Sequence, residues 1–253
     1  MASARREPPR RDAALPRLPA VPPLRYVLAA LLAVPLLLAG LAALVQYSPL
    51  DMALSRLFVD PATQRFDWRH APLLELLGHQ AARGLPIAVG VVALLAGLAA
   101  VAVERLRPWR AILLTLGAAM IVTPLMVNQL KTRTTQPCPV EVIEFGGARS
   151  YDASRLGPFW AGTGAAPGHC LPSGHAGGGY ALLALFFAGW ASGRRTWRHA
   201  GLAVGVAAGV GFGLVRIAQG AHFASATLWS ALVAWTICAA LFMPLICRRP
   251  REG

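Results

Sequence analysis

Six long apolar runs constrain this chain more than any other feature of its sequence. Each run is close to the roughly 20 helical residues needed to cross a hydrocarbon core. The runs lie near residues 26–46, 85–103, 111–130, 176–192, 200–219 and 223–247. Because 56% of the residues are hydrophobic and only 14% are charged, we expect an all-α polytopic membrane protein with six transmembrane helices in a bundle.

The two ends of the chain are polar and lie outside this predicted membrane domain of residues 26–247. Residues 1–25 are rich in Arg and Pro and have no apolar period, which predicts a disordered tail. Residues 248–253 form a second, shorter tail. The first apolar run exceeds the roughly 7–15 residues of a signal-peptide core, so it indicates an anchor helix that is not cleaved.

Positive charge is distributed unevenly between the two sides of the predicted membrane. An even number of spans puts both ends of the chain on one side, which carries +11 of the total net charge of +13. The positive-inside rule assigns that side to the cytoplasm, in a multi-pass protein of a bacterial-type inner membrane. The basic composition is thus a topology signal, and no nucleic-acid partner is expected.

The first outward connection, near residues 47–84, is predicted to contain two interfacial helices. Ser48, Pro49 and Asp51 have the pattern of a helix start, with side chains that can cap it. Residues 71–84 are predicted to form the second helix. Both helices are expected to lie on the outer membrane surface.

The second outward connection, near residues 131–174, is long enough to be a functional loop. It contains Cys138 and Cys170. A disulfide between them is plausible if the outer side is an oxidising periplasm or cell exterior, and two free thiols are the alternative.

Four ionisable side chains are expected to meet at the outer face because of the directions in which the helices run. Lys131 ends the third apolar run and His175 begins the fourth. Gly220 is a natural helix terminator, which separates Arg216 at the end of the fifth run from His222 at the start of the sixth. The N–H groups and partial positive charge of a helix start also favour anions.

This combination of two cations, two imidazoles and a helix start suits a phosphate ester. Each residue also has a simpler explanation by itself, since Lys131 could be an anchor at the membrane interface and His175 a polar helix cap. The sequence contains no convincing metal-ligand cluster, and no metal or other cofactor is expected.

The order and spacing of these residues resemble the type 2 phosphatidic acid phosphatase superfamily, which also contains vanadium haloperoxidases. The superfamily pattern is K-x6-R-P, then P-S-G-H, then S-R-x5-H-x3-D. The matching residues here are Lys131 with Cys138-Pro139, then Pro172-Ser173-Gly174-His175, then Arg216 and His222. The resemblance extends from about residue 50 to 245, and the predicted spans exclude a soluble haloperoxidase.

The resemblance implies a metal-independent hydrolase in which His222 is the nucleophile and forms a phosphohistidine. His175 would protonate the leaving alcohol and then activate water. The phosphate oxygens would be held by Lys131, Arg216, Ser173 and the N–H of Gly174.

Three positions depart from the superfamily pattern: Cys138 replaces Arg, Val215 replaces Ser, and Ala226 replaces Asp. The loss of the aspartate matters most, because it would orient the imidazole of His222 and fix its tautomer. Ser225 or Thr227 could bond to the ring instead. The candidate replacements for the missing cation are Arg133, Arg149 and Arg83, the last paired with His79 on one helix face.

We therefore expect a phosphatase that acts on a lipid phosphate or diphosphate at the outer face, with that lipid and the bilayer as its partners. Phosphatidate, phosphatidylglycerophosphate, polyprenyl diphosphate and the lipid A phosphates fit equally well. One alternative is a catalytically impaired relative that binds lipid phosphate headgroups, and another is a lipid phosphotransferase. A small-solute transporter is disfavoured, since its ionisable groups would lie near the bilayer midplane.

Overall fold

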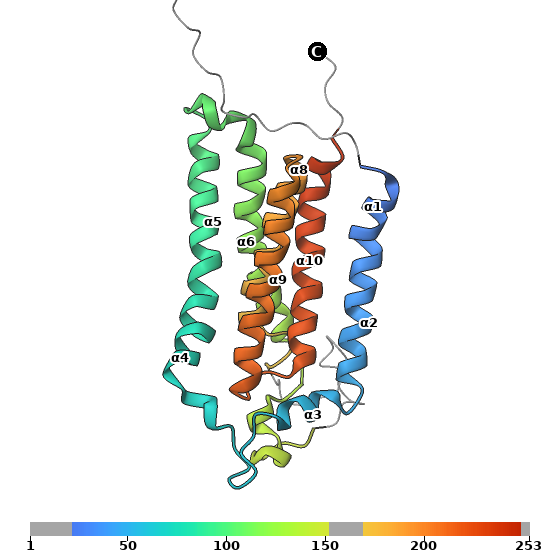
Figure 1. Ribbon diagram of the computed structural model, residues 1–253, viewed down its shortest axis with the longest axis vertical. Helices are drawn as coiled ribbons and strands as arrows, with labels where there is room; N and C mark the ends of the chain where they lie inside the picture. Colours follow the sequence, from blue (N-terminus) through green and yellow to red (C-terminus); the bar gives the residue numbers. More distant parts are fainter. Residues whose placement is uncertain (1–21, 152–168, 249–253) are drawn as a thin grey trace, which may run out of the picture.

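The computed structural model describes residues 22–151 and 169–248, which form a bundle of long helices (Figure 1). Within these residues there are no named strands, only isolated bridges between Asp60 and Arg65 and between Val142 and Arg149. Five helices are long and apolar enough to cross a membrane: Leu24–Gln46, Pro72–Ala99, Glu104–Lys131, Arg195–Ala218 and Ala224–Ile246. The predicted all-α, multi-pass membrane architecture is therefore confirmed.

Several of these long helices contain short segments of different helical pitch. The first consists of α1 (Leu24–Leu28), the π-helical η1 (Ala29–Ala33) and α2 (Val34–Gln46). The second consists of α4 (Pro72–Glu75), the π-helical η3 (Leu76–Ala81) and α5 (Ala82–Ala99). The others are the 3-10 segment η4 (Glu104–Trp109) with α6 (Arg110–Lys131), then α9 (Arg195–Ala218) and α10 (Ala224–Ile246).

The apolar run near 176–192 does not form one long helix. It is divided into α7 (Gly174–Ala181) and α8 (Ala184–Ala191), each of 8 residues and too short to cross a membrane by itself. The pair lies inside the bundle, where α7 contacts α6, α9 and α10. Hydropathy alone does not separate a helix packed inside a protein from one that faces lipid, so the expected count of six single spans is not found.

Glycines allow α7 to contact the backbone of α9 directly. A Cβ atom on Gly179 would lie 2.7 Å from the backbone of Ala208. A Cβ atom on Gly209 would lie 2.2 Å from the ring of Tyr180. Small residues at such positions are the usual means of close helix packing in membranes.

The segment 71–84 is not the separate interfacial helix that its sequence suggested. It continues without interruption into α5, as the first part of the long helix Pro72–Ala99. Gly78 in η3 packs against α9, where an added Cβ would lie 2.8 Å from Val215 and 3.4 Å from Arg216. This contact ties the start of the helix to the end of α9, so the segment is part of the bundle.

The helix α3 (Leu50–Arg56) is present, but Asp51 does not cap it. Its N-cap is Pro49, with no side-chain capping bond. Asp51 is fully buried and accepts hydrogen bonds from the backbone N–H of Ser225, at 2.9 Å, and from its hydroxyl. The carboxylate therefore caps α10 instead, where a negative charge at the helix N-terminus is favourable.

The helix ends that carry the candidate site residues lie at one end of the bundle. Here α6 and α9 end, and α7 and α10 begin. The same end carries α3, at the bottom of Figure 1. The expected disordered tail falls largely on residues 1–21 and the second tail on residues 249–253, both outside the described residues, while the first long helix already begins at Leu24.

Candidate functional site

A cavity of about 350 Å³ lies at this end of the bundle. Five residues singled out from the sequence line it: Lys131, Cys138, Cys170, Arg216 and His222. The lining also includes residues that the sequence did not single out: Arg69, His70, Glu75, Val140, Glu141, His169, Gln219 and Ala221. The cavity is thus rich in basic side chains, as an anion site requires.

The turn between α9 and α10 brings Arg216 and His222 together. Gly220 has φ of +65°, and its N–H donates to the carbonyl of Ile217 while the N–H of Ala221 donates to that of Arg216. This is the hydrogen-bond pattern of a Schellman motif, which ends helices at a left-handed residue. The predicted helix break at Gly220 is confirmed.

The imidazole of His222 is held by a backbone carbonyl. Its Nδ1 lies 2.9 Å from the carbonyl oxygen of Cys170, and the side chain is only 3% exposed. A carbonyl oxygen can only accept a hydrogen bond, so Nδ1 carries the proton and Nε2 keeps its lone pair in the neutral ring. This is the tautomer that an attacking Nε2 needs.

Burial and nearby positive charge keep that ring neutral. Burial is the larger cause and the charge of Lys131 the next in lowering the pKa of His222 well below its usual 6.5. Arg216 and His175 act in the same direction, and the Cys170 carbonyl acts against it. The site therefore combines an uncharged imidazole with two cations.

The hydroxyls of Ser225 and Thr227, which the sequence offered as partners for this ring, do not form a hydrogen bond with it. The hydroxyl of Ser225 donates to Asp51. In the described part of the structure, the buried hydroxyl of Thr227 has no hydrogen-bond partner. Neither therefore replaces the superfamily aspartate, and the Cys170 carbonyl was missed because a main-chain acceptor leaves no trace in residue identity.

Arg216 is oriented by a pair of residues that sequence reasoning also missed. Its Nη1 donates to Oε1 of Gln219 at 2.8 Å, and Nε2 of Gln219 donates to Oε1 of Glu75 at 3.1 Å. The Nε of Arg216 is buried and has no hydrogen-bond partner among the described residues. Gln219 follows Arg216 at i,i+3, a spacing that could have revealed it.

His175 lies close to the cavity but is not one of the described residues that line it. Its ring packs against that of His79, with the centroids 5.0 Å apart. Both of its ring nitrogens are buried and lack hydrogen-bond partners within the described ranges. Lys131, Arg216 and Arg83 all act on it electrostatically, so it belongs to the same cluster of charges.

Ser173 caps α7 and does not line the cavity, as far as the described residues show. Its hydroxyl accepts from the N–H of Ala176 at 3.4 Å, its own N–H donates to the carbonyl of Ala226, and the residue is fully buried. Gly174 begins α7 and is also absent from the described lining. The hydroxyl of Ser173 therefore has the structural role of capping the start of α7.

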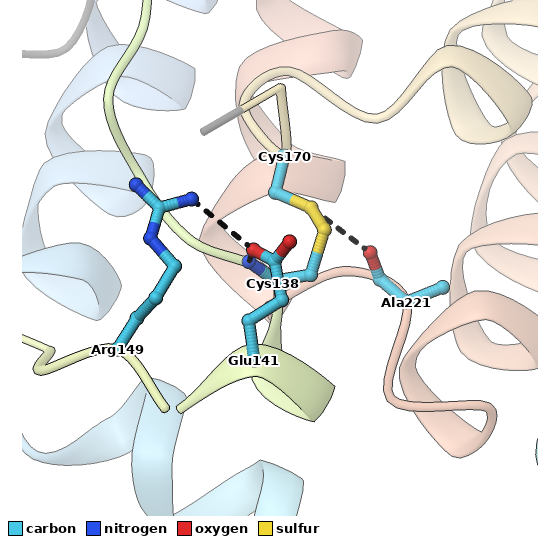
Figure 2. A network of polar contacts seen from close by, with 5 residues as sticks. All are labelled: Cys138, Glu141, Arg149, Cys170 and Ala221. Atoms are coloured by element: carbon cyan, nitrogen blue, oxygen red, sulfur yellow. Dashed lines mark hydrogen bonds and ion pairs between the residues drawn. A yellow bond between two sulfur atoms is a disulfide. The ribbon is translucent and has the colours of Figure 1, made fainter. Parts of the chain in front are cut away.

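The three candidate replacement cations differ in position. Arg83, at the exposed start of α5, acts electrostatically on Lys131, His175 and Arg216. Arg149 pairs with Glu141 at 3.4 Å (Figure 2). Arg133 is exposed and absent from the described lining of the cavity. Arg83 has the best electrostatic position of the three.

A disulfide joins Cys138 to Cys170, which are 32 positions apart in sequence and have their Cα atoms 5.2 Å apart (Figure 2). The superfamily pattern has arginine at position 138, so this chain has a crosslink where a phosphate-binding cation would stand. Among residues 22–151 and 169–248, no group of three His, Cys, Asp or Glu side chains could hold a metal ion.

Comparison with known families agrees with this arrangement. The model of the PAP2 superfamily matches residues 112–245, which is more than half of the chain. The matched region runs from α6 to α10 and contains Lys131, His175, Arg216 and His222. No curated protein and no solved structure matches the chain. Because the family model matches more than half of the chain, the chain belongs to the PAP2 superfamily, whose members are phosphatases and related phosphoester hydrolases.

Proposed function

We propose that this protein is a membrane-embedded phosphatase that hydrolyses a lipid phosphate or diphosphate through a phosphohistidine intermediate on His222. The main observation is the hydrogen bond between Nδ1 of His222 and the carbonyl of Cys170. It leaves Nε2 unprotonated in a cavity that also contains Lys131 and Arg216. Membership of the PAP2 superfamily supports phosphoester chemistry.

The reaction has two displacements at phosphorus. Nε2 of His222 attacks the phosphorus atom, the bond from phosphorus to the lipid oxygen breaks, and His175 donates a proton to the leaving oxygen. Water then attacks the phosphohistidine and gives a proton to His175, which releases inorganic phosphate and restores both imidazoles.

The charges around His175 suit this sequence of steps. Burial, the largest cause, and then the charges of Arg216, His79, Arg83 and Lys131 lower the pKa of His175 to about 3. A bound phosphate offsets the positive charge around the ring, so substrate binding raises that pKa and favours the acid. Lys131 and Arg216, which line the cavity, also stabilise the charge on the phosphate oxygens during transfer.

A lipid substrate agrees with the position of the cavity at one end of an apolar bundle. Large apolar side chains on α5 are exposed, including Ile87 at 62% and Leu95 at 61%. A lipid can therefore keep its chains beside the helices while its phosphate enters the cavity. The disulfide fits an oxidising outer compartment, which supports a site that faces outward. The excess of positive charge at the other end of the bundle supports a bacterial-type inner membrane with both termini cytoplasmic.

The experiment is phosphate release from a panel of lipids by the purified protein. The panel contains phosphatidate, phosphatidylglycerophosphate, a polyprenyl diphosphate and lipid A phosphates. His222→Ala is expected to abolish turnover, and His175→Ala to lower it by about 10²–10⁴-fold. The exposed His199, near the opposite end of α9, supplies the control His199→Ala, which should retain wild-type activity.

The outcomes separate the alternatives. Trapping of labelled phosphate on wild-type protein but not on His222→Ala supports the phosphohistidine. Full activity in His222→Ala would refute it. Binding of the lipids without turnover would identify a catalytically impaired relative, and appearance of the phosphate on a second lipid would identify a phosphotransferase.

A further inference from the structure

Cys170 contacts both the nucleophile and the crosslink of this site. Its carbonyl oxygen accepts the hydrogen bond from Nδ1 of His222, and its sulfur is bonded to that of Cys138. The residue is 1% exposed. The group that sets the tautomer of His222 therefore belongs to a residue whose side chain is covalently fixed.

The other half of the disulfide is attached to the turn that carries His222. The N–H of Cys138 donates to Oε2 of Glu141 at 2.8 Å, and the N–H of Val140 donates to the carbonyl of Gly220 at 3.1 Å. Figure 2 shows that the sulfur of Cys170 lies beside the carbonyl of Ala221, at 3.4 Å. A sulfur in a disulfide has no proton to donate, so this is a packing contact.

These contacts form a closed circuit. It runs from Cys138 through Val140 to Gly220, along the turn to His222, across to the carbonyl of Cys170, and back through the disulfide. Without the S–S bond, none of these contacts joins residue 138 to residue 170. The segments around Cys138 and Cys170 could then shift relative to each other far enough to weaken the hydrogen bond between the Cys170 carbonyl and His222.

The chain after Cys170 is held separately. The carbonyl of Leu171 accepts from the hydroxyl of Thr134 at 2.6 Å, and the N–H of Ser173 donates to the carbonyl of Ala226. These bonds fix the start of α7, but neither involves the peptide group of Cys170. The orientation of its carbonyl therefore depends most directly on the crosslink.

We propose that the Cys138–Cys170 disulfide is a positioning element that orients His222 through the carbonyl of Cys170, so that the site works fully only in its oxidised form. This inference rests on the proposed function and assigns to the crosslink the orienting role of the carboxylate that Ala226 replaces. The competing explanation is a crosslink that only stabilises the fold.

Reduction by a dithiol is the chemical change that the proposal concerns. The dithiol supplies two electrons and two protons. The S–S bond breaks, Cys138 and Cys170 each gain S–H, and the dithiol is oxidised to its cyclic disulfide. Reoxidation reverses the change without altering any residue.

The test measures the tautomer of His222 and the steady-state constants on the same samples. Protein with ¹⁵N-labelled histidine is studied as wild type, after reduction with dithiothreitol, and as Cys138→Ser. A His222→Asn sample assigns the signal. We expect one Nδ1–H tautomer in the oxidised protein and a mixture after reduction. We expect kcat to fall by up to about tenfold, the loss expected when one supporting hydrogen bond is broken, with KM changed less than twofold.

The control is Cys247→Ser, which removes a free and only partly buried cysteine at the end of α10. It should leave the tautomer, kcat and KM unchanged with or without reductant. Recovery of kcat after reoxidation of the wild type excludes irreversible unfolding as the cause. Reduction and reoxidation of the wild type still test the proposal if Cys138→Ser does not fold.

Wild-type kcat together with an unchanged tautomer in the reduced protein would overturn the proposal. A drop in melting temperature with no change in tautomer or kcat would also overturn it, in favour of a crosslink that only stabilises. If the oxidised wild type releases no phosphate from any lipid, the proposed function fails, while the ¹⁵N signal still decides whether the disulfide orients His222.

Discussion

The backbone N–H of His222 donates to the carbonyl oxygen of Arg216 at 3.3 Å. The two residues that carry the end of the PAP2 motif are therefore joined through their main chains, and their side chains enter the cavity from the same turn. The spacing of five intervening residues is the length of this turn. Its geometry depends on the left-handed conformation of Gly220.

Gly220→Ala is expected to destabilise the protein and lower its activity. An added Cβ would lie 2.4 Å from the ring of Phe66, and φ of +65° is unfavourable for alanine. A backbone strain of about 1–3 kcal/mol is expected, plus the cost of moving the ring. Thermal unfolding and lipid phosphatase assays measure the effect.

Gly211→Ala is the matched control for this variant. Gly211 lies within α9 and would have nothing within 4 Å of its new Cβ. This variant should be as stable as the wild type or more so, since alanine favours helix. Equal melting temperatures for the two variants would contradict the role assigned to Gly220.

Gln219→Ala is expected to weaken the binding of phosphate by Arg216. The change removes the acceptor at 2.8 Å from Nη1 of Arg216. A hydrogen bond to a charged group contributes about 1.5–3 kcal/mol, so we expect kcat/KM to fall by roughly tenfold or more. Steady-state kinetics with a lipid phosphate provide the measurement. The exposed Gln80 in η3 gives the control Gln80→Ala, and an equal loss in both variants would argue against the pairing.

Asp51 is expected to make stability depend on pH. Burial, the largest cause, raises the pKa of Asp51 from 3.8 to about 6, although its hydrogen bonds with Ser225 oppose the rise. The folded protein then binds more protons than the unfolded chain between these values. Stability from this group is therefore greatest below pH 3.8 and falls as the pH rises through 6, by about 3 kcal/mol.

Asp51→Asn should remove this contribution to the slope of melting temperature against pH between about 4 and 6.5. The exposed carboxylate of Asp67 provides the comparison, because Asp67→Asn should keep the wild-type slope. Identical slopes for wild type and Asp51→Asn would show that the buried carboxyl is not responsible.

As the pH is lowered, activity is expected to fall only at a pH below the usual histidine pKa of 6.5. Burial and the charge of Lys131 lower the pKa of His222 below 6.5, and a protonated Nε2 cannot attack phosphorus. Activity should therefore persist as the pH falls through 6.5. Lys131→Met should move this fall in activity to higher pH, because a charge that lowers the pKa is lost.

The pH profile of kcat/KM checks this prediction, with ¹⁵N titration of His222 as a second measurement that is independent of substrate ionisation. A fall in wild-type kcat/KM that already occurs at pH 6.5 or above, as the pH is lowered, would contradict the prediction. No shift in Lys131→Met would indicate that the charge of Lys131 does not contribute to the pKa of His222.

The parts of this protein that could be predicted from its sequence are those with local signals. Apolar length identified the membrane helices, and Gly220 identified the break between Arg216 and His222. The division of α7 from α8 depends on packing inside the bundle, so hydropathy alone did not reveal it. The separate helix expected at 71–84 was wrong because contact with α9 decides whether that segment joins the bundle.

The site was harder to predict where its contacts join distant parts of the chain. The bond from Asp51 to Ser225 spans 174 residues and that from Gln219 to Glu75 spans 144. A capping pattern near Asp51 pointed to its own helix, whereas the structure uses it for another. The partner of His222 is a main-chain oxygen, which any residue type could supply.

The cap that Asp51 provides for α10 has a consequence for the boundaries of a working protein. Residues 112–245 match the PAP2 superfamily, yet Asp51 and Glu75 lie before that region, as does Gln46, which accepts from the indole of Trp229 at 2.7 Å. A fragment cut to the family match would lose all three supports. A stable fragment is therefore expected to begin upstream of Gln46, because residues before the family match hold the helices around the cavity.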